Sequence, residues 1–249
     1  MSRVAMRPSA ILFDLDDTIL RYEGGDYRKL WRACVEEHCH HFDGLAPRDL
    51  FNEIQSISER FWRDPERHRR GRLDMRAARQ QFVREAARSL GSPNDQAANE
   101  LANHYHERRE SEVVPFEGAL ETLEYFKKSP IKTALLTNGG TDTQRRKIES
   151  YQLDRFFDCI LIEGEFGKGK PNPDVYLHLT RELGVSERES WIVGDNLEWE
   201  VRVPQRLGFY AIWNDYLGRG LPRESEVVPD RIVKSIHELI DPATGLPIP

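Results

Sequence analysis

Apolar residues gather in short runs near the start of the chain and again in its second half. The first run covers residues 10–13 and ends abruptly at Asp14. An apolar run of this length is typical of a buried β-strand. Because side chains alternate along a strand, Asp14 and Asp16 point the same way and Leu15 points the other way. The pattern therefore predicts a strand that carries two carboxylates to its end.

Between residues 27 and 112, apolar positions recur at helical spacing and strand signals are almost absent. This spacing predicts four amphipathic helices. Their apolar residues are Leu30, Trp31, Val35 and Phe42; then Leu50, Phe51, Ile54, Ile57, Phe61 and Trp62; then Met75, Phe82, Val83 and Leu90; and finally those of 101–105. The breaks between them fall at Gly and Pro residues, which interrupt helices.

From residue 113 onward, predicted strands and helices alternate. The strands cover residues 132–136, 159–162, 191–193 and 210–213, the helices 116–127, 142–151, 173–183 and 197–207, and a weaker last element 232–240. This order predicts an α/β fold, a Rossmann-like parallel sheet with helices on both faces. The first strand belongs to that sheet, so residues 1–20 and 114–249 form a predicted core, and 21–113 are an all-helical cap inserted into it.

Composition narrows the class of protein. The chain has 249 residues, of which 31% are charged, and a net charge of −6, which argues against a general nucleic-acid binder. Its three cysteines make no disulfide framework. There is no apolar run long enough to cross a membrane, and the first residues do not resemble a signal peptide. We expect a cytoplasmic protein with neither nucleic-acid nor membrane partners.

Polar residues follow four of the predicted strands of the sheet. They are Asp14 and Asp16; Thr137 and Asn138, with two glycines; Lys170, at the end of a Gly-rich loop; and Asp195, with Glu198 and Glu200 behind it. Ligands of open parallel sheets bind at the edge where the strands end. These side chains are therefore expected at one site.

Their chemistry suits a phosphate ester. Asp14 and Asp195 offer the hard oxygen ligands that Mg²⁺ prefers. A hydroxyl, a lysine and the amides of a glycine-rich loop suit a phosphoryl group. One carboxylate can attack phosphorus to give an aspartyl-phosphate, and a second can protonate the leaving oxygen and then deprotonate water.

On these residues, the chain resembles the haloacid dehalogenase-like (HAD) hydrolase superfamily, and within it the phosphatases that carry a helical cap after the first strand. Asp14 and Asp16 match the family's first motif, in which the leading Asp is the nucleophile and the other is the general acid and base. Thr137 matches the second motif, Lys170 the third and Asp195 the fourth.

The resemblance implies a Mg²⁺-dependent phosphomonoester hydrolase acting on a small phosphorylated metabolite. It implies a metal site made of Asp14, the carbonyl of Asp16, and Asp195. Thr137, Asn138 and Lys170 would bind the phosphoryl group, and the cap, moving on a hinge at residues 22–25, would exclude water and select the leaving group.

Two features depart from the family pattern. Glu200 stands where a second Asp is usual, and we assign it, with Thr18, a supporting role; its simpler interpretation is a solvent-facing side chain or one paired with Arg202 or Arg206. Pro204 is expected to kink or shorten the helix that follows.

Simpler interpretations exist for the other motifs. Asp14 and Asp16 could cap a turn, residues 137–140 could form only a turn and helix cap, and Asp195 could be an N-cap. Residues 164–170 nearly spell a nucleotide-binding loop, but Pro171 replaces the Ser or Thr that such a loop needs.

The predicted cap carries two clusters of functional residue types. Cys34 and His38 could share a helix face and bind zinc, but no second ligand pair follows, so a partly buried helix is favoured. Eight arginines between residues 60 and 79 mostly form a solvated face. Arg72 and Arg76 are candidates for contact with an anionic substrate, because residues 71–74 read as a loop.

Three other functions fit parts of the pattern. A 2-haloacid dehalogenase would use Asp14 against carbon, but would need neither metal nor Asp16. A phosphomutase would pass the phosphoryl group to a second sugar hydroxyl. A non-catalytic binding protein would use the same scaffold without turnover. The sequence indicates no particular oligomeric state.

Overall fold

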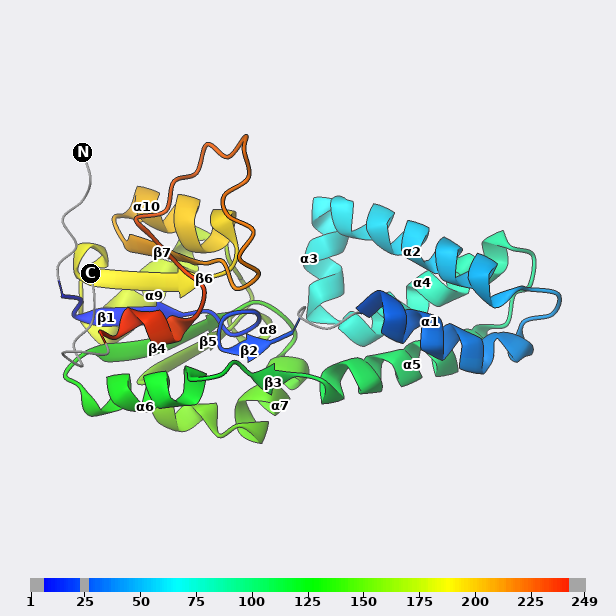
Figure 1. Cartoon of the computed structure of the whole chain (residues 1–249), viewed down its shortest axis with the longest axis horizontal. Coiled ribbons are helices and arrows are strands. Elements are labelled where there is room, and N and C mark those ends of the chain that lie inside the picture. The colour runs from blue at the N-terminus through cyan, green and yellow to red at the C-terminus, as the bar shows by residue number, and fades with distance from the viewer. Residues whose placement is uncertain (1–6, 23–26, 242–249) are drawn as a thin grey trace. The chain divides into compact units, whose positions relative to one another are not determined.

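The computed structural model describes residues 7–22 and 27–241. The chain divides into two compact units, which we call the core unit (Met1–Gly24 with Val114–Pro249) and the cap unit (Gly25–Val113). Figure 1 draws both units. Of the predicted hinge, only Tyr22 is among the described residues, and the Pro/Gly-rich tail after Asp241 lies outside them.

The core unit contains a parallel six-stranded sheet with β1 (Ala10–Phe13) near its middle. The strand order is β5-β4-β1-β6-β7-β8, with β4 at Lys132–Thr137, β5 at Cys159–Ile162, β6 at Ser190–Gly194, β7 at Tyr210–Asn214 and β8 at Arg231–Val233. Phe13 pairs with Leu135 on one side and with Val193 on the other. The strand order therefore reverses at β1, which is where ligands bind in folds of this class.

Helices cover both faces of this sheet (Figure 1). They are α6 (Ala119–Lys128), α7 (Thr141–Ser150), the short α8 (Glu163–Phe166), α9 (Pro173–Leu183) and α10 (Val203–Leu207), with 3₁₀ turns at Leu153–Phe156, Glu187–Glu189 and Ile236–Leu239. Helix α9 packs into the core cluster that contains Leu12, and on the other face Phe126 of α6 lies 5.9 Å from Phe13, ring to ring. The predicted α/β fold class is confirmed.

Two short strands lie where the chain leaves and re-enters the core unit. β2 (Leu20–Arg21) pairs antiparallel with β3 (Val114–Pro115). The sequence analysis did not predict them, because two residues are too few for a recognisable alternation. They join the ends of the core segment on either side of the insertion.

The cap unit is helical among its described residues. Its elements are α1 (Tyr27–His38), a 3₁₀ turn (Cys39–His41), α2 (Pro47–Arg63), α3 (Pro65–Leu73), α4 (Met75–Ser89) and α5 (Asp95–Ser111). Helix α3 corrects the prediction of four helices and of a loop at 71–74. Its charged sequence has no apolar periodicity, yet Asp64 caps it by accepting from the Arg67 amide at 2.8 Å. Only Asp74 separates α3 from α4.

The cap unit has its own apolar core, which includes Trp31 and the stacked ring of Tyr105, 3.7 Å away between centroids. Cys34 is part of that core, and the imidazole nitrogens of His38 and His104 lie 3.0 Å apart. Within the described residues, no metal-ligating group of His, Cys, Asp and Glu includes these side chains. The favoured interpretation, a partly buried helix, agrees with this arrangement.

Over the described part of the chain, every helix is too short or too polar to cross a membrane.

Candidate active site

The predicted residues meet at the carboxyl edge of the core sheet. Asp14 follows β1, Thr137 ends β4 and Asp195 follows β6, and these three strands are neighbours. Lys170 reaches the same edge from the loop after α8, and Glu200 reaches it from the turn of helix after β6. The parallel topology thus brings together side chains that are up to 186 positions apart in the chain, since carboxylate oxygens of Asp14 and Glu200 lie within 4.8 Å of each other.

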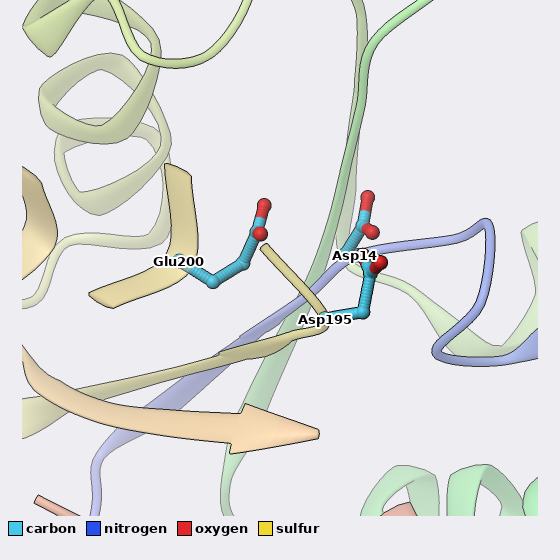
Figure 2. Close-up of side chains that lie close together, drawn as sticks. All are labelled: Asp14, Asp195 and Glu200. Atoms are coloured by element: carbon cyan, nitrogen blue, oxygen red, sulfur yellow. The ribbon is translucent and has the colours of Figure 1, made fainter. Parts of the chain in front are cut away.

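Lys170 is the centre of the site's charge network. Its ammonium forms an ion pair with Oδ1 of Asp14 and a second one, 2.7 Å long, with Oε1 of Glu200. Lys170 is 1% exposed and Glu200 is 0% exposed. Figure 2 shows the carboxylate of Glu200 directed toward those of Asp14 and Asp195. An ammonium buried so completely requires such partners.

Burial and mutual repulsion shift the pKa values of these groups. Burial raises the pKa of Asp14, against the opposing effect of Lys170. Burial also raises the pKa of Glu200 to about 7, again against Lys170. Burial, and then the charges of Asp14 and Glu200, raise the pKa of Asp195 well above its ordinary value. For Lys170, burial favours loss of the proton, but the attraction of Asp14 and Glu200 prevails and its pKa is raised.

The residues fit a divalent cation. Carboxylate oxygens of Asp14, Asp195 and Glu200 all lie within 4.8 Å of one another. Hard oxygen ligands of this kind suit Mg²⁺. Three carboxylates against the single ammonium of Lys170 leave an excess of negative charge, which a divalent cation would neutralise. Both carboxylate oxygens of Glu200 already have partners, whereas Lys170 engages only Oδ1 of Asp14, so Asp14 and Asp195 are the ligands that the arrangement favours.

Glu200 corrects the simpler interpretation of its role. Instead of facing solvent or pairing with Arg202, it is buried, and Oε2 accepts from the backbone amide of Asn196 at 3.0 Å. Glu198 makes the pair with Arg202, at 3.2 Å. Sequence reasoning placed Glu200 outside the core because glutamate is rarely buried without a partner, and its partner Lys170 is distant in sequence.

A π-helix at Leu197–Arg202 turns Glu200 inward. The α-helix that follows begins at Val203, so Pro204 lies in its first turn, where it needs no hydrogen bond. The helical segment extends to Leu207, as a π-helix followed by an α-helix, and the expected kink or shortening at Pro204 stays a prediction. Gly194 lies against Glu200: a Cβ there would collide with Cγ of Glu200 and would lie 3.0 Å from Cβ of Asp14. π-Helical turns are often found at functional sites.

The side chain of Asn138 holds the Lys170 loop. Its amide nitrogen donates to the carbonyl of Lys170 at 2.8 Å, and its oxygen accepts from the Lys170 amide at 2.7 Å. Glu163, which was not predicted as a site residue, accepts from the Gly139 amide at 3.1 Å. Direct phosphate binding by Asn138 stays a prediction, and its observed contacts position the backbone of Lys170.

Asp16 contacts helix α7. The Nζ atom of Lys147 lies 2.8 and 2.9 Å from the two carboxylate oxygens, and Nε2 of Gln144 donates to Oδ2 at 3.1 Å. The same Nε2 atom donates to Oγ1 of Thr137 at 2.6 Å. Neither Gln144 nor Lys147 could be predicted as a site residue, because α7 has only one clearly apolar position from which to identify its buried face.

The remaining predicted residues are placed as follows. The Thr18 hydroxyl is buried and has no hydrogen-bond partner among the described residues, so its supporting role stays a prediction. Arg76 donates to Asn103 at 3.1 Å within the cap unit, and Arg72 lies near the end of α3. The role of each arginine as a contact of the substrate stays a prediction.

Residues 8–208 match the family model described as haloacid dehalogenase-like hydrolase. The chain belongs to the haloacid dehalogenase-like hydrolase family. The matched range includes every residue of the site described above.

Two curated relatives are phosphatases. Phosphoserine phosphatase from Thermus thermophilus is 34% identical over 162 residues, which cover 65% of this chain and 63% of that protein. Glyceraldehyde 3-phosphate phosphatase from Methanopyrus kandleri is 26% identical over 241 residues, which cover 93% of this chain and 95% of that protein. Members of this family with different substrates are thus comparably similar to the chain.

Solved structures share the fold. The HAD hydrolase YfnB from Bacillus subtilis, solved bound to magnesium, has a TM-score of 0.69 at 21% identity and covers 94% of this chain and 97% of its own. A 2-haloacid dehalogenase from Pseudomonas syringae has a TM-score of 0.62 at 22% identity, with 94% and 96% covered. A magnesium-bound HAD hydrolase and a 2-haloacid dehalogenase thus share this fold with the chain, so the similarity at this level shows the fold and not the reaction.

Proposed function

We propose that the protein is a Mg²⁺-dependent phosphomonoester hydrolase that forms an aspartyl-phosphate on Asp14. The observation that carries the proposal is the contact of Lys170 with both Asp14 and Glu200 at the carboxyl edge of the sheet, next to Asp195. This arrangement combines a nucleophile with positive charge for a phosphoryl group. The named activities of the two curated relatives support the reaction class.

In the first step, an oxygen of Asp14 forms a bond to phosphorus as the ester P–O bond breaks. Asp16 donates a proton to the departing alkoxide, which leaves as the free alcohol. Lys170, together with the hydroxyl of Thr137, binds the phosphoryl oxygens as their charge shifts. Burial of Lys170 makes this attraction stronger than it would be in water.

In the second step, water attacks the phosphorus of the aspartyl-phosphate. Asp16 takes a proton from that water, and the bond from phosphorus to Asp14 breaks. Inorganic phosphate is released, and both aspartates return to their starting states. One residue thus serves as acid in the first step and as base in the second.

A bound Mg²⁺ would be held by Asp14 and Asp195, together with the Asp16 carbonyl that the family resemblance implies, and would offset charge on the phosphoryl oxygens. Glu200 keeps Lys170 in place rather than acting on the substrate, since both of its oxygens already have partners.

The substrate class is a small phosphorylated metabolite, and we expect the cap unit to select its leaving group. Arg72 and Arg76 stay our candidates for contact with an anionic part of that group. The relatives act on phosphorylated compounds as different as an amino acid and a triose, so substrate choice is not inherited from the shared core.

The test is release of inorganic phosphate, in the presence of Mg²⁺, from a panel of sugar phosphates, nucleoside monophosphates and phospho-acids. Wild type is expected to hydrolyse members of at least one class. Asp14→Asn is expected to reduce release to background, while Asp95→Asn, an exposed cap substitution, leaves it unchanged. Retained turnover by a correctly folded Asp14→Asn protein would remove Asp14 as nucleophile.

A 2-haloacid dehalogenase is the second candidate, favoured by the structural neighbours of that name. There, Asp14 would attack C2 of the haloacid and displace halide, and water would hydrolyse the ester. That reaction needs no second acid, whereas here Asp16 is held by two side chains of α7. Chloride release from 2-chloropropionate in the presence of a chelator, with no phosphate release from the panel, would select this function instead.

A further inference from the structure

We propose that Lys147 is a positioning residue for Asp16, acting from helix α7 together with Gln144. The inference rests on the proposed function, in which Asp16 is the general acid and base. It is carried by a chain of contacts that begins at the Asp16 carboxylate and ends at the phosphate-binding hydroxyl of Thr137.

The Asp16 side chain is the more exposed member of its pair with Lys147. It is 27% exposed, compared with 6% for that of Lys147. Both carboxylate oxygens contact the ammonium of Lys147, and one of them also accepts from Gln144. Since a short carboxylate side chain rotates freely unless it is held, α7 determines where the carboxyl group points.

Lys147 is itself held in place. It follows Gln144 by three positions, so both side chains lie on the same buried face of α7. Its Nζ atom also lies 4.1 Å from the centre of the Tyr22 ring, within range of a cation–π contact. The ammonium of Lys147 therefore lies between an aromatic ring and a carboxylate. Its position is fixed, so it can orient the carboxylate of Asp16.

The contacts of Gln144 link the proposed proton donor, Asp16, to the proposed phosphate-binding residue, Thr137. One amide nitrogen donates both to Asp16 and to Thr137. Helix α7 thereby sets the distance between the group that donates the proton and a group that binds the phosphoryl oxygens.

The experiment is a double-mutant cycle between Asp16→Asn and Lys147→Met, with kcat and KM measured on two esters. Phenyl phosphate has a poor leaving group that needs the acid, and para-nitrophenyl phosphate has a good one that does not. Lys147→Met is expected to lower kcat about 10–100-fold on phenyl phosphate and about threefold or less on the other ester, because positioning contacts have effects of this size.

Non-additivity is the deciding result. In the Asp16→Asn background, Lys147→Met is expected to change kcat by about twofold or less, because its effect acts through a group that is already disabled. A full additional loss in that background, or equal losses on the two esters, would overturn the proposal. Lys147→Gln, which keeps a polar side chain of similar reach, repeats the test if the methionine variant does not fold.

Arg145→Met is the matched control. Arg145 lies on the same helix, but its partner is Glu165, at 2.6 Å, and it does not contact Asp16. It is expected to leave kcat on both esters unchanged. If Asp16→Asn itself lowers kcat equally on both esters, the proposed acid role fails. If the loss of kcat in Asp16→Asn depends on the leaving group as expected, but the losses in the double-mutant cycle are additive, only the positioning role of Lys147 fails.

Discussion

The carboxylate of Glu200 and the ammonium of Lys170 lie 2.7 Å apart, and both side chains are fully buried. Asp14 contacts the same ammonium. Lys170 is therefore held from two sides, and under the proposed mechanism Glu200 fixes the position of this lysine relative to the nucleophile Asp14. Substitution of Glu200 is therefore a test of how the position of Lys170 affects the site.

Glu200→Gln is expected to lower kcat about 10–100-fold, because outer partners of catalytic groups have effects of this size. Glu200→Asp is expected not to restore activity, since its side chain is one methylene shorter and no longer reaches Lys170. Steady-state kinetics on a good phosphate ester would measure both. Glu198→Gln is the control: it lies on the same helix turn, but is exposed and pairs with Arg202. Equal effects of Glu198→Gln and Glu200→Gln would contradict the buried role of Glu200.

The strand ends could be predicted from sequence because their signal is local. The run ending at Asp14 and the strand at 159–162 are found where predicted, and the parallel order then places Asp14, Thr137 and Asp195 at one edge. The residues that hold those groups could not be predicted in the same way. Glu200 and Lys147 are charged residues whose buried state depends on partners far away in the sequence.

The prediction of the helical insertion was wrong at helix α3, because the local signals there were weak. Helix α3 has a sequence of charged residues without apolar periodicity, so it was not predicted as a separate helix and residues 71–74 were read as a loop. The signals that could have identified it were Asp64 as an N-cap and Pro65 in the first turn. The π-helical turn before Pro204 could not be predicted, because it leaves no pattern in the spacing of apolar residues.

Gly194→Ala is expected to lower both stability and activity, because the new methyl group would collide with Glu200 and come within 3.0 Å of Cβ of Asp14. Overpacking of this kind costs about 1–3 kcal/mol of unfolding free energy. Combining it with Glu200→Ala, which removes the colliding atoms, is expected to recover part of that cost. Chemical denaturation of the single and double variants would measure the coupling, and strictly additive costs would show that the two sites do not touch.

Lys170→Met is expected to abolish turnover and to lower the unfolding free energy by about 3–5 kcal/mol in the presence of a chelator. The reason is that Asp14, Asp195 and Glu200 remain close together without their counter-ion. Mg²⁺ is expected to restore part of the lost stability. Denaturation with and without the metal would test this. A variant as stable as wild type in chelator would mean that the ammonium does not offset repulsion among these acids.

Binding of Mg²⁺ to the wild-type protein is expected to raise its thermal midpoint without any substrate present. At a free concentration of 100 times the dissociation constant, one site stabilises the folded state by about 2.7 kcal/mol. Asp195→Asn removes a carboxylate from the cluster and is expected to abolish most of that shift, whereas the exposed Asp95→Asn retains it. Thermal unfolding followed across a Mg²⁺ titration measures metal binding without catalysis. Asp14→Asn is also expected to weaken the shift, because Asp14 belongs to the same carboxylate cluster. An undiminished shift in Asp195→Asn would place the metal elsewhere on the protein.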